Sequence, residues 1–162
     1  MKILLALTFI LFSVGKTFGQ CSNLENMNQE QRENYLIATS NEVIKTFGPD
    51  YYRDNQKPTI SGPEKFCSGD KRTEIAKNVG REYYIITYPY DKSKETLDFD
   101  FSSEVKIWKD TGEPLDVTFG NGHGKSFLFI PYKQQKMLDV NDKVPYQQAI
   151  KPDTNIWQKE DK

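Results

Sequence analysis

Residues 28–49, NQEQRENYLIATSNEVIKTFGP, decide the fold because they predict the one long helix on which the other elements can pack. Asn28, followed three residues later by Gln31, is typical of a capping box. Gly48 and Pro49 predict the stop, as a left-handed cap followed by a residue that cannot continue a helix. Apolar side chains recur between these signals at helical spacing, at Leu36, Ile37, Val43, Ile44 and Phe47. The segment 29–47 therefore predicts an amphipathic helix roughly 28 Å long, since each residue adds ~1.5 Å.

Four later segments show the period of two that is typical of β-strands. The segment 82–90, EYYIITYPY, is apolar or aromatic on both faces and predicts a central strand. The segment 97–107 predicts a second, bent strand, and 115–119 and 127–130 predict two more. A further short strand is a candidate near 58–60. The sequence thus predicts an α+β fold, in which one N-terminal amphipathic helix packs on an antiparallel sheet of about four strands.

Apolar and polar side chains alternate within 97–107. Phe99 lies on the apolar face of this segment and is expected to pack against Phe47 of the helix. Asp98 and Asp100 lie on the other face, where two carboxylates in this relation could bind calcium or act as acid and base. The favoured interpretation is an exposed polar strand face, on which aspartate is ordinary.

The N-terminus has the layout of a signal peptide. A basic residue precedes an apolar run at 3–14, and small residues before Gln20 predict cleavage at that point. The run is shorter than the ~20 residues that a membrane span needs. The sequence therefore predicts export to the periplasm or the extracellular space, with a signal peptide at 1–19, a single domain at 20–132 and a polar C-terminal tail at 133–162.

The chain has two cysteines, Cys21 and Cys67. In an oxidising compartment they predict a structural disulfide. The alternative is that Cys21 is lipidated, because it lies just beyond the apolar run. Bacterial lipidation favours small residues before the cysteine, and Gln20 fits that pattern poorly.

The glycine-rich segment 119–127, FGNGHGKSF, ends like a phosphate-binding loop at Gly124–Ser126. The first glycine of such a loop should stand at Phe119, and the residues that follow do not predict a helix. A reversal between two strands, with positive φ at several glycines, is the favoured interpretation. His123 is the only histidine and has no ligand-type neighbour within the segment, so no metal site is predicted. No nucleotide or other cofactor is predicted either.

The aromatic residues are the candidate binding residues. Tyr84, Tyr88 and Tyr90 share one face of the segment 82–90, and Trp108 falls on the polar face of its own segment. An exposed row of aromatic rings could stack on sugars or bind a protein. The alternative is a second small core, covered by the tail or by the loop-like segment 50–80.

The layout of a helix followed by an antiparallel meander is similar to cystatin-like and PepSY-like folds. The cystatin Gln-x-Val-x-Gly pattern is absent, so the protease contact of that family does not transfer. The stretches REYYIITYPYD and FSSEVKIWKDTGEPLDVTFGNG, and the leader ending in FGQ, also resemble small secreted proteins of Bacteroidota. That resemblance implies export and implies no mechanism.

The sequence favours a non-catalytic, exported binding or interaction module with a protein or glycan partner. The formal net charge of −1 argues against nucleic acid, because it gives the chain no overall attraction for phosphate. Two alternatives stay open. One is a small secreted hydrolase that uses a cleft between the sheet and residues 50–80, and the other is an inhibitor or immunity-type protein.

Overall fold

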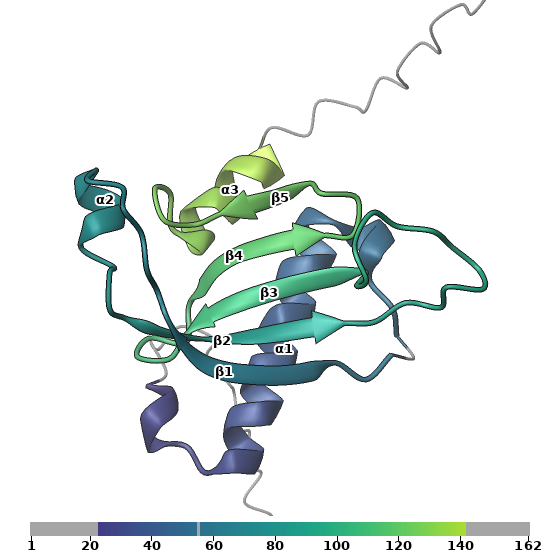
Figure 1. The fold of residues 1–162 in the computed structure, drawn as a ribbon, viewed down its shortest axis with the longest axis horizontal. Helices are drawn as coiled ribbons and strands as arrows, with labels where there is room; N and C mark the ends of the chain where they lie inside the picture. The colour runs from purple at the N-terminus through teal and green to yellow at the C-terminus, as the bar shows by residue number, and fades with distance from the viewer. Residues whose placement is uncertain (1–22, 55, 142–162) are drawn as a thin grey trace, which may run out of the picture.

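The computed structural model describes residues 23–54 and 56–141, and it has the α+β class that the sequence predicts (Figure 1). One antiparallel sheet has five strands in the order β1-β2-β3-β4-β5, so each strand pairs with its neighbour in sequence. The strands are β1 (Thr59–Lys65), β2 (Glu82–Tyr88), β3 (Ser103–Trp108), β4 (Pro114–Phe119) and β5 (Gly124–Ser126). The long helix crosses behind this sheet in Figure 1.

That helix, α1 (Gln29–Phe47), has the predicted bounds and the predicted capping box. The Asn28 side chain accepts a hydrogen bond from the amide of Gln31 at 2.9 Å, and the Gln31 side chain accepts one from the amide of Asn28 at 3.2 Å. The C-terminal end differs from the prediction, because Gly48 has φ −155° and is not left-handed. A Cβ atom at Gly48 would lie 2.3 Å from the Phe119 ring, so glycine is required by this close approach.

The core lies between one face of α1 and one face of the sheet. Cross-strand pairing brings Ile86, Val105 and Val117 into one row, and all three are buried. The helix contributes Leu36, Val43 and Ile44, each at most 1% exposed. One polar contact lies among them, where the Ser40 and Tyr88 hydroxyls approach to 2.7 Å. We call this side of the sheet the inner face.

The predicted strand at 97–107 is only half correct. Residues 97–102 form a loop, and the strand β3 begins at Ser103. The loop bonds across the ends of two other strands, since the Phe99 amide donates to Gly120 and the Ser102 amide donates to Tyr88. Phe99 is consequently 43% exposed and stacks on Phe101. The predicted contact between Phe99 and Phe47 is therefore wrong.

The glycine-rich segment forms a tight hairpin between β4 and β5. The Phe119 amide donates to the His123 carbonyl at 2.7 Å, and Gly124 is already paired with Thr118. Within this hairpin only Gly122 has positive φ, at +83°, so the prediction of several such glycines is wrong. Gly124 is required for a different reason, because a Cβ atom there would lie 2.3 Å from the Val117 carbonyl oxygen.

The two ends of the sheet also differ from the sequence prediction. The strand β1 is longer than the candidate near 58–60, and the strand predicted at 127–130 is absent there. Phe127 instead turns inward and packs on Phe47, with 5.4 Å between ring centroids.

The helix α3 (Tyr132–Asn141) begins where a polar tail was predicted. Its Lys136 forms an ion pair with Glu42 of α1 at 2.5 Å, and its Asp139 forms one with Lys125 of β5. The Tyr132 ring packs edge-on against Phe47. Residues 142–162 of the predicted tail lie outside the described residues.

A short helix, α2 (Thr73–Ala76), lies in the excursion between β1 and β2. Arg81, at the end of this excursion, contacts the β3–β4 turn. Its guanidinium donates hydrogen bonds of 2.7 and 3.0 Å to the two carboxylate oxygens of Asp110. Among the helices of the described ranges, none is both long enough and apolar enough to span a bilayer.

We expect Ile86→Ala to lower the free energy of unfolding by about 2–5 kcal/mol, because it opens a cavity under α1. Phe99→Ala should change it by less than about 1 kcal/mol, since that ring is 43% exposed and outside the core. Urea unfolding of both variants measures the difference. Equal losses would show that the loop 97–102 belongs to the core after all.

Gly124→Ala is expected to cost about 1–3 kcal/mol, because the new methyl group must displace the β4 backbone. Gly69→Ala is the matched control. A Cβ atom at Gly69 meets nothing within 4 Å and its φ is not positive, so the substitution should be neutral or slightly stabilising. Thermal melts measure both variants. Equal changes in their melting temperatures would contradict the hairpin geometry.

Candidate functional site

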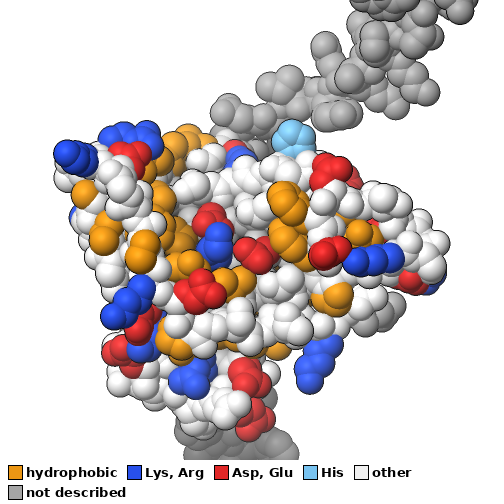
Figure 2. All heavy atoms as spheres, viewed as in Figure 1, with side chains coloured by type: hydrophobic (Ala, Val, Ile, Leu, Met, Phe, Trp, Pro, Cys, Tyr) orange, Lys and Arg blue, Asp and Glu red, His pale blue; other side chains and the backbone are white. Residues whose placement is uncertain are grey.

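The side of the sheet opposite α1, which we call the outer face, is the candidate site. Figure 1 shows no helix of the described residues lying across it. The strand register places the following side chains on this face: Thr59, Ser61, Glu64, Tyr83, Ile85, Thr87, Glu104, Lys106, Trp108, Asp116, Thr118 and Ser126. Acidic and basic side chains lie next to one another at its middle (Figure 2).

The pairing arranges these side chains in rows that run across the strands. One row reads Ile85, Lys106, Asp116 and Ser126, and the next reads Thr59, Thr87, Glu104 and Thr118. Neighbouring strands are ~4.8 Å apart, so side chains adjacent in a row are within reach of one another. The middle of the outer face therefore carries mainly hydroxyl and charged groups.

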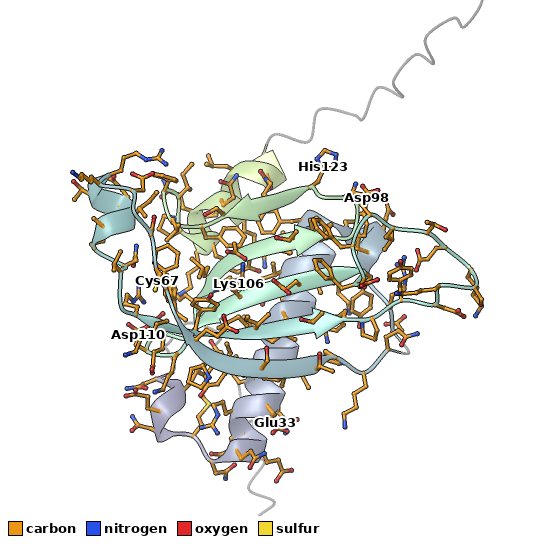
Figure 3. All side chains as sticks on the ribbon, viewed as in Figure 1. Glu33, Cys67, Asp98, Lys106, Asp110 and His123 are labelled. Carbon is orange, nitrogen blue, oxygen red and sulfur yellow. The ribbon has the colours of Figure 1, made fainter. Side chains whose placement is uncertain are left out.

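Lys106 lies at the centre of this surface, between two carboxylates (Figure 3). Its ammonium nitrogen is 3.3 Å from Asp116 Oδ2 and 3.8 Å from Glu104 Oε1. All three side chains are about one quarter exposed. Thr87 donates a long hydrogen bond of 3.5 Å to the other oxygen of Glu104. One cation is thus shared by two partly buried anions.

Asp116 is the least satisfied member of this group. Its Oδ1 atom is buried and has no hydrogen-bond partner among the described residues. Burial raises the pKa of the Asp116 carboxyl, and the charge and hydrogen bond of Lys106 oppose that rise. A buried acceptor without a donor costs free energy.

Aromatic rings form one end of the outer face. The Trp108 ring is 6% exposed and lies under the Arg81 guanidinium, 4.0 Å from its centroid. Phe66 and Tyr83 pack edge-on against it, with centroids at 5.6 and 6.2 Å. The Tyr83 hydroxyl also donates a hydrogen bond of 3.3 Å to the Glu64 carboxylate. Trp108 is therefore a rigid support and offers no open ring for stacking.

The aromatic residues predicted from the sequence do not form one exposed row. Tyr84 and Tyr88 are buried on the inner face, Tyr90 follows the end of β2 half-buried, and Trp108 lies on the outer face. Asp116 is not among the site residues predicted from the sequence. Its signal is present, however, because Asp116 is the one charged residue inside a strand whose neighbours Leu115 and Val117 are buried.

The other sequence candidates lie away from Lys106. Asp98 and Asp100 are exposed in the loop before β3, and Asp100 pairs there with Lys92. His123 is exposed at the β4–β5 hairpin, as Figure 3 shows. Cys67 is exposed and has no disulfide partner among the described residues, while Cys21 lies outside them.

The residues Gly124–Ser126 form the strand β5 and do not form a loop that enters a helix. Lys125 points to the inner face, where its ammonium lies 4.8 Å from the centre of the Phe47 ring and pairs with Asp139. In the part of the chain that the structure describes, no group of three or more His, Cys, Asp or Glu side chains is placed to ligate a metal ion.

No protein-family model, curated protein or solved structure matches this chain.

We expect Asp116 to titrate above the ordinary aspartate value of 3.8, because burial disfavours its charged form. The folded state then holds this proton more tightly than the unfolded state. The contribution of Asp116 to stability is therefore largest below the unfolded pKa and is lost as the pH rises through the folded pKa.

Carbon NMR titration of the side-chain carboxyls measures this pKa directly. Lys106→Met should raise the pKa of Asp116 further, because the ammonium that opposes the rise is gone. Asp91 is the internal control, since hydrogen bonds from Ser93 lower its pKa to about 2. A pKa of Asp116 at or below the ordinary value would show that the charge and hydrogen bond of Lys106 outweigh burial, and would contradict this prediction.

Proposed function

We propose that this protein is an exported binding module that holds a protein partner on the outer face of its sheet. The observation that carries the proposal is the partly exposed group of Glu104, Lys106 and Asp116 at the centre of a sheet face that no described helix covers. A partner with complementary charges and donors can bond the accessible atoms of these three side chains. Export is supported by the signal-peptide pattern of the sequence 1–19.

Two further features support binding over catalysis. Both carboxylates contact the same ammonium, so each is already held in an ion pair. The face is also rigid, because β3 is paired on both sides and the Trp108 end is fixed by Arg81. A preorganised polar surface loses little conformational entropy when a partner docks.

A small hydrolase is the second candidate, and the raised pKa of Asp116 beside Glu104 favours it. Unequal carboxyl groups can act as acid and base. Lys106 argues against this role, because its ammonium lies between the two groups where a substrate would have to enter. Hydrolysis of peptide or glycoside substrates that is abolished by Asp116→Asn would establish the hydrolase instead.

We expect a photo-crosslinking residue at Ser61, which is exposed on the outer face, to give a protein adduct in the exported fraction of the source cell. The same residue at Ala38, exposed on α1, is the control and should give none. Excess unlabelled protein should suppress the adduct, whereas excess Thr118→Arg protein should not, because the new side chain blocks the face.

Adducts from both positions, or equal suppression by the two competitors, would contradict the proposal. Location in the cytoplasmic fraction would contradict the export part alone.

A further inference from the structure

We propose that Cys21 and Cys67 form a disulfide that ties the N-terminal end of the domain to the excursion 66–81, and that this bond stabilises the Trp108 end of the outer face. The sequence predicts the pair from the compartment alone. A disulfide requires an oxidising compartment, so this inference rests on the export part of the proposed function.

The chain enters the fold at the end of the sheet from which the excursion leaves. The short helix η1 (Leu24–Asn26) begins there, and the Leu24 side chain is fully buried in the core. The Glu25 carboxylate lies 3.4 Å from the ammonium of Lys109, the residue that follows β3. Cys21 is three residues before Leu24, so chain connectivity keeps their Cα atoms within ~11 Å of each other.

Cys67 lies at the same end of the sheet. The Lys109 ammonium is also 2.7 Å from the Glu82 carboxylate, and the Lys109 amide donates to the Glu82 carbonyl at 2.9 Å. Glu82 begins β2 and is paired with Lys65, the last residue of β1. Cys67 stands two residues further on, where the chain leaves β1 (Figure 3). The start of η1 and the end of β1 thus meet around Lys109, so a disulfide between these segments would join neighbours.

The Cys67 thiol is accessible to the chemistry that forms such a bond. Its side chain is exposed and has no disulfide partner among the described residues. The step is thiol–disulfide exchange with an oxidised dithiol oxidoreductase of the exported compartment. One cysteine thiolate attacks a sulfur of the oxidoreductase disulfide, and the second thiolate then displaces the oxidoreductase from the mixed disulfide. The pair loses two protons and two electrons, and the oxidoreductase leaves as its dithiol.

The bond would act beside the contacts that hold Trp108. The base of the excursion is closed by two backbone hydrogen bonds, from the Phe66 amide to the Arg81 carbonyl and from the Gly80 amide to the Phe66 carbonyl. Phe66 packs edge-on against the Trp108 ring, and the Arg81 guanidinium lies over it. A covalent link at Cys67 therefore restrains the residue next to Phe66 and keeps the base of the excursion closed.

The bond would also close a large loop. The 45 residues 22–66 lie between the two cysteines, and they include α1 and β1. A cross-link of this kind restricts the unfolded chain, and the effect grows with the length of the loop. Reduction should therefore lower the stability of the whole domain as well as that of the excursion.

Mass spectrometry of the chain isolated from the exported fraction, without reductant, tests the bond. The intact mass should rise by two hydrogen atoms on reduction, and alkylation before reduction should label no thiol. Peptide mapping should give one fragment that joins Cys21 to Cys67. Free thiols, a diacylglyceryl group on Cys21 or a disulfide to another molecule would each overturn the inference.

Thermal melts of Cys21→Ser, Cys67→Ser and the double variant test the effect on the domain. Each should melt roughly 5–15 °C below the wild-type chain, and the double variant no lower than the single ones, because all three lose the same bond. A thiol reductant should lower the wild-type melting temperature by the same amount and leave the variants unchanged. A loss in only one single variant would overturn the inference.

Limited trypsin digestion, well below the melting temperature, tests the excursion itself. Cleavage after Lys71 and Lys77, both exposed in the excursion, should be about threefold faster or more in Cys67→Ser than in the wild-type chain. Cleavage after Lys92, exposed in the loop between β2 and β3, is the control and should change less. Equal acceleration at these positions would overturn the local restraint of the excursion.

The outcomes separate the bond from the proposed function. An exported chain with two free thiols would overturn the disulfide and leave export and the outer-face partner standing. A chain found in the cytoplasmic fraction with two free thiols would overturn the disulfide and export together. Loss of the Ser61 adduct, with the disulfide present, would overturn the outer-face partner alone.

Discussion

The packing of α1 on the inner face of the sheet is the interaction on which the rest of the structure depends. Ile44 and Val43 of the helix and Ile86, Val105 and Val117 of the sheet are all essentially removed from water. Burial of a large aliphatic side chain contributes ~1.5–3 kcal/mol, so this layer supplies much of the driving force for folding. It also determines which of the alternating positions in each strand face away from α1, and therefore which side chains form the outer face.

The parts of the fold that local chemistry determines could be predicted from the sequence. The bounds of α1 follow from Asn28, Gln31 and Pro49, and the strands β2, β3 and β4 follow from their alternation. The loop 97–102 alternates like a strand, but its hydrogen bonds to the ends of β2 and β4 are tertiary, and its own sequence does not reveal them. The strand β1 was only hinted at, since Gly62 and Pro63 interrupt its pattern and a bulge lies there.

The candidate site was harder to predict, for a physical reason. Both faces of the segment 82–90 carry apolar or aromatic residues, so its sequence does not reveal which face meets the helix. The choice depends on the partner strands, whose inner positions include Val105, Ile107 and Val117 and whose outer positions include the charged residues Glu104, Lys106 and Asp116. Tyr84 and Tyr88 occupy inner positions of β2 and are therefore buried in the core. Asp116 and Lys106 become neighbours only through the pairing of β3 with β4, which a single segment cannot show.

The order of the strands has a consequence for how the chain reaches this structure. Every strand pairs with the strand that precedes or follows it, so no connection has to cross the sheet. The connections differ in length, because β1 and β2 are joined by the excursion that holds α2 and β4 and β5 by a tight hairpin. The strands gain their hydrophobic stabilisation from α1, which precedes all of them in the chain. The core is thus completed by contacts between segments that lie far apart in the sequence.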